Sequence, residues 1–199
     1  PPVAVGSHLD SVPEGGIFDG PLGVYAGLEA VRAMQDAGVA PARPITVVSF
    51  TEEEGQRFAD GLLGSSVAVG ERSVETALAL EDDDGVTLRE ALTEIDYPGE
   101  GRLDASEWDA WYELHIEQDT SLESTGVPVG VVTTITGITH CAVEIRGEAN
   151  HAGATAMDDR TDALAAASEL VLAVERAADE VVATDSPSAV GTVGSLDVT

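Results

Sequence analysis

Three of the four histidines in this chain lie in short segments that also carry carboxylates. In the first segment His8 precedes Asp10 by two residues, and Asp19 follows His8 by eleven. Imidazole and carboxylate groups are the ligands of hydrolytic metal centres. The residue types therefore predict a metal-dependent hydrolase. The other segments that carry such groups contain Glu53 and Glu54, then His115 and Gln118, and then His151.

The glycines between His8 and Asp19 let that loop fold back, so both side chains could share one metal ion. Asp10 is well placed to accept the imidazole N–H of His8 and orient the ring. The adjacent Glu53 and Glu54 could divide two tasks, with one binding metal and the other taking a proton from water. Taken singly, each segment has an ordinary explanation, because His-X-Asp pairs and glutamate runs are common in acidic proteins. Their combination favours the metal site.

The elements expected around these segments would bring them together. Strands are expected at residues 3–5, 45–50 and 111–116, and apolar residues recur at helical spacing over 24–34. A strand, helix, strand order is typical of an α/β fold with a mostly parallel sheet. Because the segments that contain His8, Glu53–Glu54 and His115 each follow a strand, their side chains should converge at one sheet edge, where such folds bind ligands. His115 is expected to end the third strand.

The pattern changes after residue 126. Residues 127–134 and 139–146 alternate like antiparallel strands, a helix face runs over 164–181, and a further strand is expected at 189–193. We predict a catalytic metal-binding domain at residues 1–133 and the start of an α+β lid or dimerisation domain at 134–199. The chain begins in an apparent strand without an initiator methionine and ends just after the strand expected at 189–193. We therefore expect the first domain to be truncated at its N-terminus and the second at its C-terminus.

The chain is strongly acidic. Nine Lys and Arg against 37 Asp and Glu give a net charge of −28, and all nine basic residues are arginine. Such a charge argues against nucleic-acid or anionic-membrane partners. We expect a cytoplasmic protein of a high-salt cell, where molar salt shortens the Debye length to about 3 Å; an ordinary acidic protein is the alternative. The run Glu81–Asp84 is expected to be solvated, and Cys141 to be buried in a strand. No apolar run is long enough to span a membrane.

Five segments, taken in order, resemble the M20 metallopeptidase-like amidases. More narrowly, they are similar to the hydantoinase/carbamoylase branch, which includes N-carbamoyl-L-amino-acid hydrolase, β-ureidopropionase and allantoate amidohydrolase. The resemblance covers about residues 3–195. The five segments are Gly6–Pro13, Phe18–Val24, Glu53–Phe58, Glu113–Gln118 and Asn150–Thr155.

The resemblance implies a role for each candidate residue. Two divalent ions (Zn, Mn, Co or Ni) would be held in part by His8, Asp19, Glu54 and His115, with Asp19 bridging them. Glu53 would be the general base, and Asp10 would orient His8. Substrate, a small ureido or amide compound, would contact Gln118, His151 and Arg160. The family also implies a homodimer formed through the lid domain.

The chain departs from the family pattern at two places. Asp119-Thr120 stands where the family has Gly-Pro, and Ala156 stands where it has proline. The family's remaining metal histidine and its carboxylate-binding residues would lie beyond Thr199, so we expect this segment alone to be inactive. Two alternatives stay open: an M20-type aminopeptidase or dipeptidase, and a non-catalytic binding or dimerisation module. The intact histidine and carboxylate set argues against the module.

Overall fold

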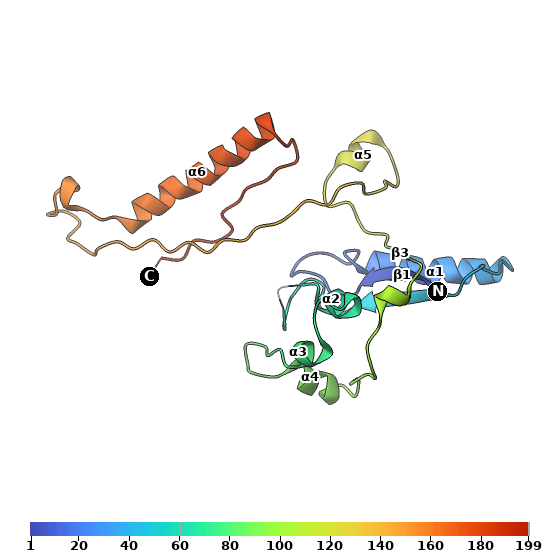
Figure 1. The fold of residues 1–199 in the computed structure, drawn as a ribbon. Helices are drawn as coiled ribbons and strands as arrows, with labels where there is room; N and C mark the ends of the chain where they lie inside the picture. Colours follow the sequence, from blue (N-terminus) through green and yellow to red (C-terminus); the bar gives the residue numbers. More distant parts are fainter. Residues whose placement is uncertain (60, 199) are drawn as a thin grey trace. The chain divides into compact units, whose positions relative to one another are not determined.

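A computed structural model describes residues 1–59 and 61–198 of the chain (Figure 1). The chain forms two compact units, Pro1–Val131 and Val132–Thr199. All the paired strands in the described residues belong to the first unit. None of the helices in residues 1–59 and 61–198 combines the length and apolar character that a bilayer crossing requires.

The first unit is built on a three-stranded parallel sheet in the order β2-β1-β3. The strands are β1 (Val3–His8), β2 (Ile45–Phe50) and β3 (Ala110–Tyr112). The predicted mixed α/β fold with a parallel sheet is confirmed. The third strand is shorter than predicted, because its pairing with β1 ends where Val5 meets Tyr112. His115 therefore lies three residues beyond the strand instead of ending it.

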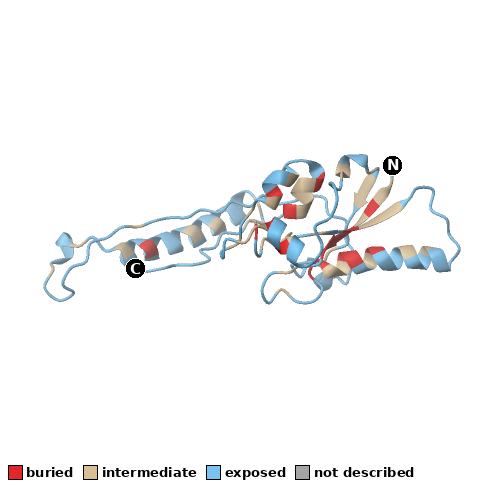
Figure 2. Cartoon of the chain, turned by 90° about the horizontal axis from the view of Figure 1, so that it is seen from below, coloured by how far each residue is buried: buried red, intermediate tan, exposed pale blue. Residues whose placement is uncertain are grey.

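Helix α1 (Pro21–Asp36) connects β1 to β2 and packs on the sheet (Figure 2). Proline at the first helical position suits a place where no backbone N–H is needed. The buried face begins with small residues, and a Cβ on Gly27 would already contact Val5 and Val47. The chain leaves the helix at Gly38, whose φ of +65° favours glycine. The predicted helix and its terminating glycine are both present.

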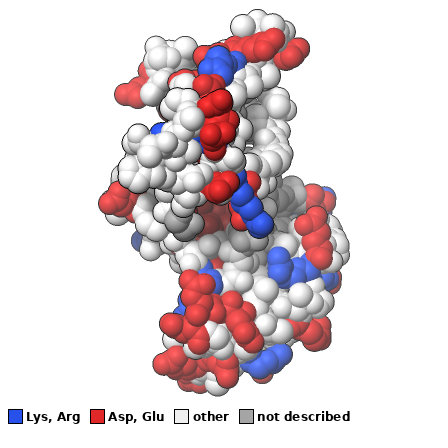
Figure 3. Space-filling view, turned by 90° about the vertical axis from the view of Figure 1, so that its left-hand side faces the viewer, with Lys and Arg blue, Asp and Glu red and all other residues white. Residues whose placement is uncertain are grey.

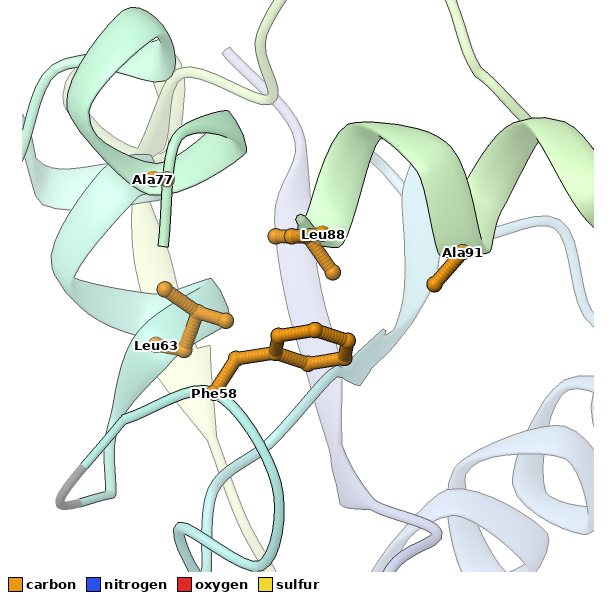
Figure 4. Close-up of a cluster of buried hydrophobic side chains, with 5 residues drawn as sticks. All are labelled: Phe58, Leu63, Ala77, Leu88 and Ala91. Carbon is orange, nitrogen blue, oxygen red and sulfur yellow. The ribbon is translucent and has the colours of Figure 1, made fainter. Parts of the chain in front are cut away.

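A hydrophobic core forms from residues that lie between β2 and β3 in sequence. Short helices surround it: α2 (Leu63–Val69), α3 (Val74–Leu78), α4 (Leu88–Glu94) and the 3-10 turn η1 (Ala105–Glu107). The helices predicted near 73–79 and 87–95 correspond to α3 and α4, whereas α2 was not predicted. The buried side chains of this core are Phe58, Leu63, Ala77, Leu88 and Ala91 (Figure 4). Helix α5 (Ser121–Thr125) follows β3.

The second unit contains the 3-10 turn η2 (Met157–Asp159) and the long helix α6 (Ala163–Thr184). The Asp162 side chain caps α6 by accepting the Ala165 N–H. Extended segments 137–150 and 190–198 lie beside the helix and line a hollow that is open to solvent.

Strands predicted at 127–134, 139–146 and 189–193 are wrong for the described residues, where these segments are extended but unpaired. Alternating apolar residues indicate which side of an extended chain is buried. A strand also needs a neighbouring chain to pair with its backbone N–H and C=O groups. Without that pairing Cys141 is exposed, contrary to the expectation that it is buried in a strand.

Candidate metal centre

The candidate site lies at the carboxyl-terminal edge of the sheet in the first unit. His8 is the last residue of β1, and the Glu52–Glu54 run follows the end of β2 at Phe50. Asp19 directly precedes the Gly20 N-cap of α1. Together with His115, these residues reach one place from four separate parts of the chain. Open α/β sheets place ligand sites at this edge.

His8 is held in one orientation. Its side chain is almost fully buried, and Nδ1 lies 2.8 Å from the backbone oxygen of Asp10. A Cβ on Gly20 would approach the His8 ring to 2.3 Å, and Gly20 has a φ of +68°. Nδ1 therefore engages the chain itself, and Nε2 lies 3.6 Å from Glu53 Oε2. This leaves Nε2 as the ring nitrogen that faces the carboxylates.

Asp19 carries a buried carboxylate that needs a partner. The residue is 3% exposed, and its Oδ1 has no hydrogen-bond partner within the described chain. The same oxygen lies 3.5 Å from Nε2 of His115, whose ring is stacked 5.7 Å from that of His8. Burying an unpaired carboxylate is costly. The orphaned oxygen therefore marks a position that a cation would stabilise.

Glu52 and Glu54, in the run after β2, form hydrogen bonds to different parts of the chain. Glu52 has a φ of +54°, and its Oε2 accepts the N–H groups of Arg57 at 3.0 Å and Phe58 at 2.8 Å. Its carboxylate therefore holds the loop and is not directed to the candidate site. The Glu54 N–H donates to Asp10 Oδ2 at 2.9 Å, which ties the glutamate loop to the His8 loop.

The carboxylates at the site are crowded. Burial raises the pKa of Glu54, and so do a hydrogen bond with Asp19 and the charges of Asp19 and Glu53; only His8 opposes them. Like charges brought this close favour a protonated carboxyl group. A divalent cation between them would reverse that preference, because it favours the ionised form.

The residues present fit a divalent metal. One ligand atom from each of His8, Asp19 and His115 lies within 4.8 Å of the others, and so do atoms of His8, Glu53 and Glu54. Mixed imidazole and carboxylate donors suit Zn, Mn, Co and Ni alike. Because His8 belongs to both groups, the two clusters are adjacent.

The three residues predicted to contact substrate belong to two different units of the chain. Gln118 is exposed in the loop between β3 and α5 of the first unit. His151 and Arg160 lie in the second unit and share one loop. The Arg160 guanidinium donates to the carbonyl groups of Ala152 at 2.6 Å and Thr155 at 2.9 Å, so it braces the turn that begins at His151.

Sequence reasoning did not single out Ser7 or Glu113. Ser7 is 1% exposed, and its Oγ donates to Glu113 Oε1 at 2.5 Å. Both residues are adjacent or nearly adjacent to candidate ligands, within segments already singled out. Nothing in the spacing, however, pairs two residues that lie 106 positions apart.

The fold and the cluster define a parallel-sheet protein with histidines and carboxylates at the carboxyl ends of its strands. The chain belongs to the peptidase family M20/M25/M40, whose family model matches residues 4–198. Membership in the predicted family is therefore confirmed.

Curated relatives and solved structures show which proteins of this family the chain is similar to. An N-carbamoyl-L-amino acid amidohydrolase from Geobacillus stearothermophilus is 45% identical over 98% of this chain and 47% of its own length. A ureidoglycolate hydrolase from Arabidopsis thaliana is 38% identical over 100% of this chain and 43% of its own length. The crystal structure of a hydantoinase/carbamoylase family amidase from Burkholderia ambifaria matches with a TM-score of 0.72 and 41% identity, covering 90% of this chain and 44% of that one. The chain thus spans about half the length of the curated relatives it matches.

Proposed function

We propose that the protein containing this chain hydrolyses a linear amide or ureido C–N bond. The substrate proposed is an N-carbamoyl-L-amino acid or a related ureido acid such as allantoate. The observation that carries the proposal is the convergence of His8, Asp19, Glu53, Glu54 and His115 at one sheet edge. The names of the relatives support the substrate class, since they include amidohydrolases for N-carbamoyl-L-amino acids and for ureidoglycolate.

Two divalent ions would be held in part by His8, Asp19, Glu54 and His115, and Asp19 is the residue proposed to serve both. Support comes from the buried, unpartnered Oδ1 of Asp19 and from the raised pKa of Glu54, both of which a cation would relieve. Such ions, when bound, polarise the scissile carbonyl and lower the pKa of a water molecule. Asp10 contributes by holding Nδ1 of His8 through its backbone oxygen.

Glu53 is proposed to move the proton. Its side chain is 30% exposed, and its Oε2 lies 3.6 Å from Nε2 of His8, so the carboxylate borders both the ligand cluster and solvent. It accepts a proton from the attacking water and delivers it to the leaving nitrogen as the C–N bond breaks. With an N-carbamoyl amino acid and one water molecule, the products are carbon dioxide, ammonia and the amino acid.

The second unit is proposed as the start of a lid and homodimerisation domain. His151 would polarise the substrate carbonyl, and Arg160 and Gln118 would contact the substrate. Arg160 already holds the turn after His151 through the Ala152 and Thr155 carbonyls. We also propose a cytoplasmic location in a high-salt cell, which the net charge of −28 supports.

The test is a substrate panel with the full-length protein in high salt. The protein is stripped of metal, and Mn, Co or Zn is added back. Ammonia release is then followed from N-carbamoyl-L-amino acids, 3-ureidopropionate, allantoate and ureidoglycolate, and amine release from dipeptides. We expect metal-dependent ammonia release from at least one ureido compound.

Cleavage of dipeptides alone would instead support the aminopeptidase or dipeptidase alternative, which the family's name keeps open. Absence of turnover from every compound, with metal bound, would contradict the proposed substrate class.

A further inference from the structure

Ser7, which is buried, and Glu113, which is exposed, form a partly buried link between two histidine-bearing segments. The Ser7 hydroxyl donates to the Glu113 carboxylate at 2.5 Å, at the short end of the range for hydroxyl-to-carboxylate bonds. Ser7 directly precedes His8, and Glu113 lies two residues before His115. The bond therefore joins the chain at one candidate metal ligand to the chain at another.

The sheet itself does not hold His115. The pairing of β1 with β2 continues to the last residue of β1, where His8 meets Phe50. The pairing of β1 with β3, in contrast, ends at Val5 and Tyr112. Residues 113–115 therefore leave the ladder before they reach the site. The Ser7–Glu113 bond is a tether at the point where the ladder hydrogen bonds stop.

The start of helix α1 packs closely against this tether. A Cβ on Gly23, at the start of α1, would lie 2.3 Å from the Leu114 backbone oxygen and 2.6 Å from Ser7 Cβ. Helix α1, the end of β1 and the segment after β3 thus meet around Ser7. A shift of residues 113–115 away from β1 would break the hydrogen bond and open this contact.

The Glu113 carboxylate differs from the candidate ligand carboxylates because it is hydrogen-bonded to Ser7. One of its oxygens receives the Ser7 hydroxyl, and the two clusters of possible ligands in the described chain do not include it. We propose that Ser7 and Glu113 are a positioning pair that fixes His115 against His8 and Asp19 and so sets the metal affinity of the His115 site. This inference rests on the proposed function, because it requires that the cluster binds metal.

The experiment measures Co²⁺ binding to the full-length, metal-stripped protein, by calorimetric titration and by the visible absorption spectrum of the bound ion. The variants are Ser7→Ala, Glu113→Ala and Glu113→Gln. Ser49→Ala is the matched control, because Ser49 pairs with Ser7 in the register of β1 and β2 but is exposed.

We expect Ser7→Ala and Glu113→Ala to weaken the binding of one Co²⁺ ion by roughly tenfold and to change its spectrum, as loss of groups that orient metal ligands does. Glu113→Gln should recover most of the affinity, since its amide oxygen still accepts the Ser7 hydroxyl. Ser49→Ala should bind as the unmodified protein does.

Two outcomes separate this inference from the proposed function. If the unmodified protein binds no Co²⁺, the metal-centre proposal fails, and the positioning role fails with it. If the unmodified protein binds Co²⁺ and Glu113→Ala binds it equally well with the same spectrum, the positioning role alone is overturned. Should Ser7→Ala not fold, the comparison of Glu113→Ala with Glu113→Gln decides, and equal affinities there would also overturn it.

Discussion

Glu53 and Glu54 are neighbours in the chain but are held differently. The Glu53 backbone oxygen accepts the Leu62 N–H at 2.8 Å, and the Glu54 N–H donates to Asp10 at 2.9 Å. These bonds fix the loop on both sides, so each carboxylate has its own surroundings. Burial and the Asp19 carboxylate raise the pKa of Glu54, because both disfavour its ionised form.

Replacing Glu53 with glutamine should remove the proton acceptor while leaving the metal cluster in place. We expect kcat to fall by about 10²–10⁴-fold, the usual contribution of general acid–base catalysis. The measurement is ammonia release together with metal content. Loss of metal along with activity would make Glu53 a ligand and contradict its assignment as the base.

Replacing Gly20 with alanine should disturb His8 directly. The new Cβ would lie 2.3 Å from the His8 ring, and residues with a side chain rarely adopt the Gly20 backbone conformation (φ +68°, ψ −56°), which costs them about 1–3 kcal/mol. We expect a lower free energy of unfolding by at least about 1 kcal/mol and weaker metal binding. Denaturant unfolding and metal titration check this, with Gly16→Ala as the control, because Gly16 also has a positive φ but has open space around it. Equal metal affinity in the two variants would contradict the steric explanation.

Residue types and strand order were enough to predict which histidines and carboxylates meet. His8, Asp19 and Glu54 come to one place because parallel strands end at the same edge. The Ser7–Glu113 bond and the contact of Gly20 with His8 could not be predicted in this way. Both depend on tertiary distances between residues far apart in the chain, or on a backbone angle, and neither is encoded in local spacing.

At the scale of elements, the loop after β2 is held to the helical core by one carboxylate. Asp82 accepts the N–H groups of Val86 at 2.9 Å and Asp84 at 3.1 Å, and it pairs with Arg57 at 2.8 Å. The Arg57 guanidinium also lies 4.7 Å from the centre of the Phe58 ring. The acidic run Glu81–Asp84 is thus not uniformly solvated, since the Asp82 side chain is only 8% exposed.

Asp82→Asn should destabilise the fold at neutral pH. The Val86 N–H, followed by Arg57 and Asp84, lowers the pKa of Asp82 below its usual value. A carboxyl group with a lowered folded-state pKa stabilises the protein above its unfolded-state pKa of about 3.9. That contribution is lost as the pH falls through the folded-state value. The thermal unfolding midpoint of the variant should therefore be lower at pH 7, and the difference should shrink below about pH 4.

Asp83→Asn is the control for this prediction, because Asp83 is exposed in the same run. A difference between Asp82→Asn and the unmodified protein that stays constant down to low pH would contradict the role of the ionised carboxylate.

The strands and the helices α1, α3 and α4 of the first unit were predicted, whereas α2 and α5 were missed and the strands expected in the second unit were not found in the described residues. Helix α6 has the predicted apolar periodicity and begins at the Asp162 cap, and both features are local. The strands expected at 139–146 and 189–193 depend on pairing with another chain segment, which alternation along one segment cannot establish. Helix α2 begins at Leu63 after a left-handed Leu62, with no capping side chain that could have signalled it.

Over the whole chain, acidic side chains far outnumber basic ones. Acidic side chains gather over the face drawn in Figure 3, with arginines among them. The formal charge of −28 means that folding brings many like charges closer together, which disfavours the compact state. The arginines relieve this only locally, as in the pairs of Arg57 with Asp82 and of Arg43 with Asp109.

The thermal unfolding midpoint of the full-length protein should therefore rise between 0.2 and 2 M KCl, because salt at molar concentration shortens the Debye length to about 3 Å. Circular dichroism melts over this range test the expectation. An uncharged osmolyte at equal osmolality is the control, since it does not screen charge. A midpoint that is unchanged or falls with KCl would contradict adaptation to a high-salt cell.

We propose that the cluster at the sheet edge binds two metal ions. The most direct test is anomalous X-ray diffraction from crystals of the full-length protein loaded with Mn²⁺ or Zn²⁺. We expect two anomalous peaks beside Asp19, with His8 and His115 among the ligands. Absence of metal density at Asp19 in a fully loaded crystal would show that the cluster is not a metal centre.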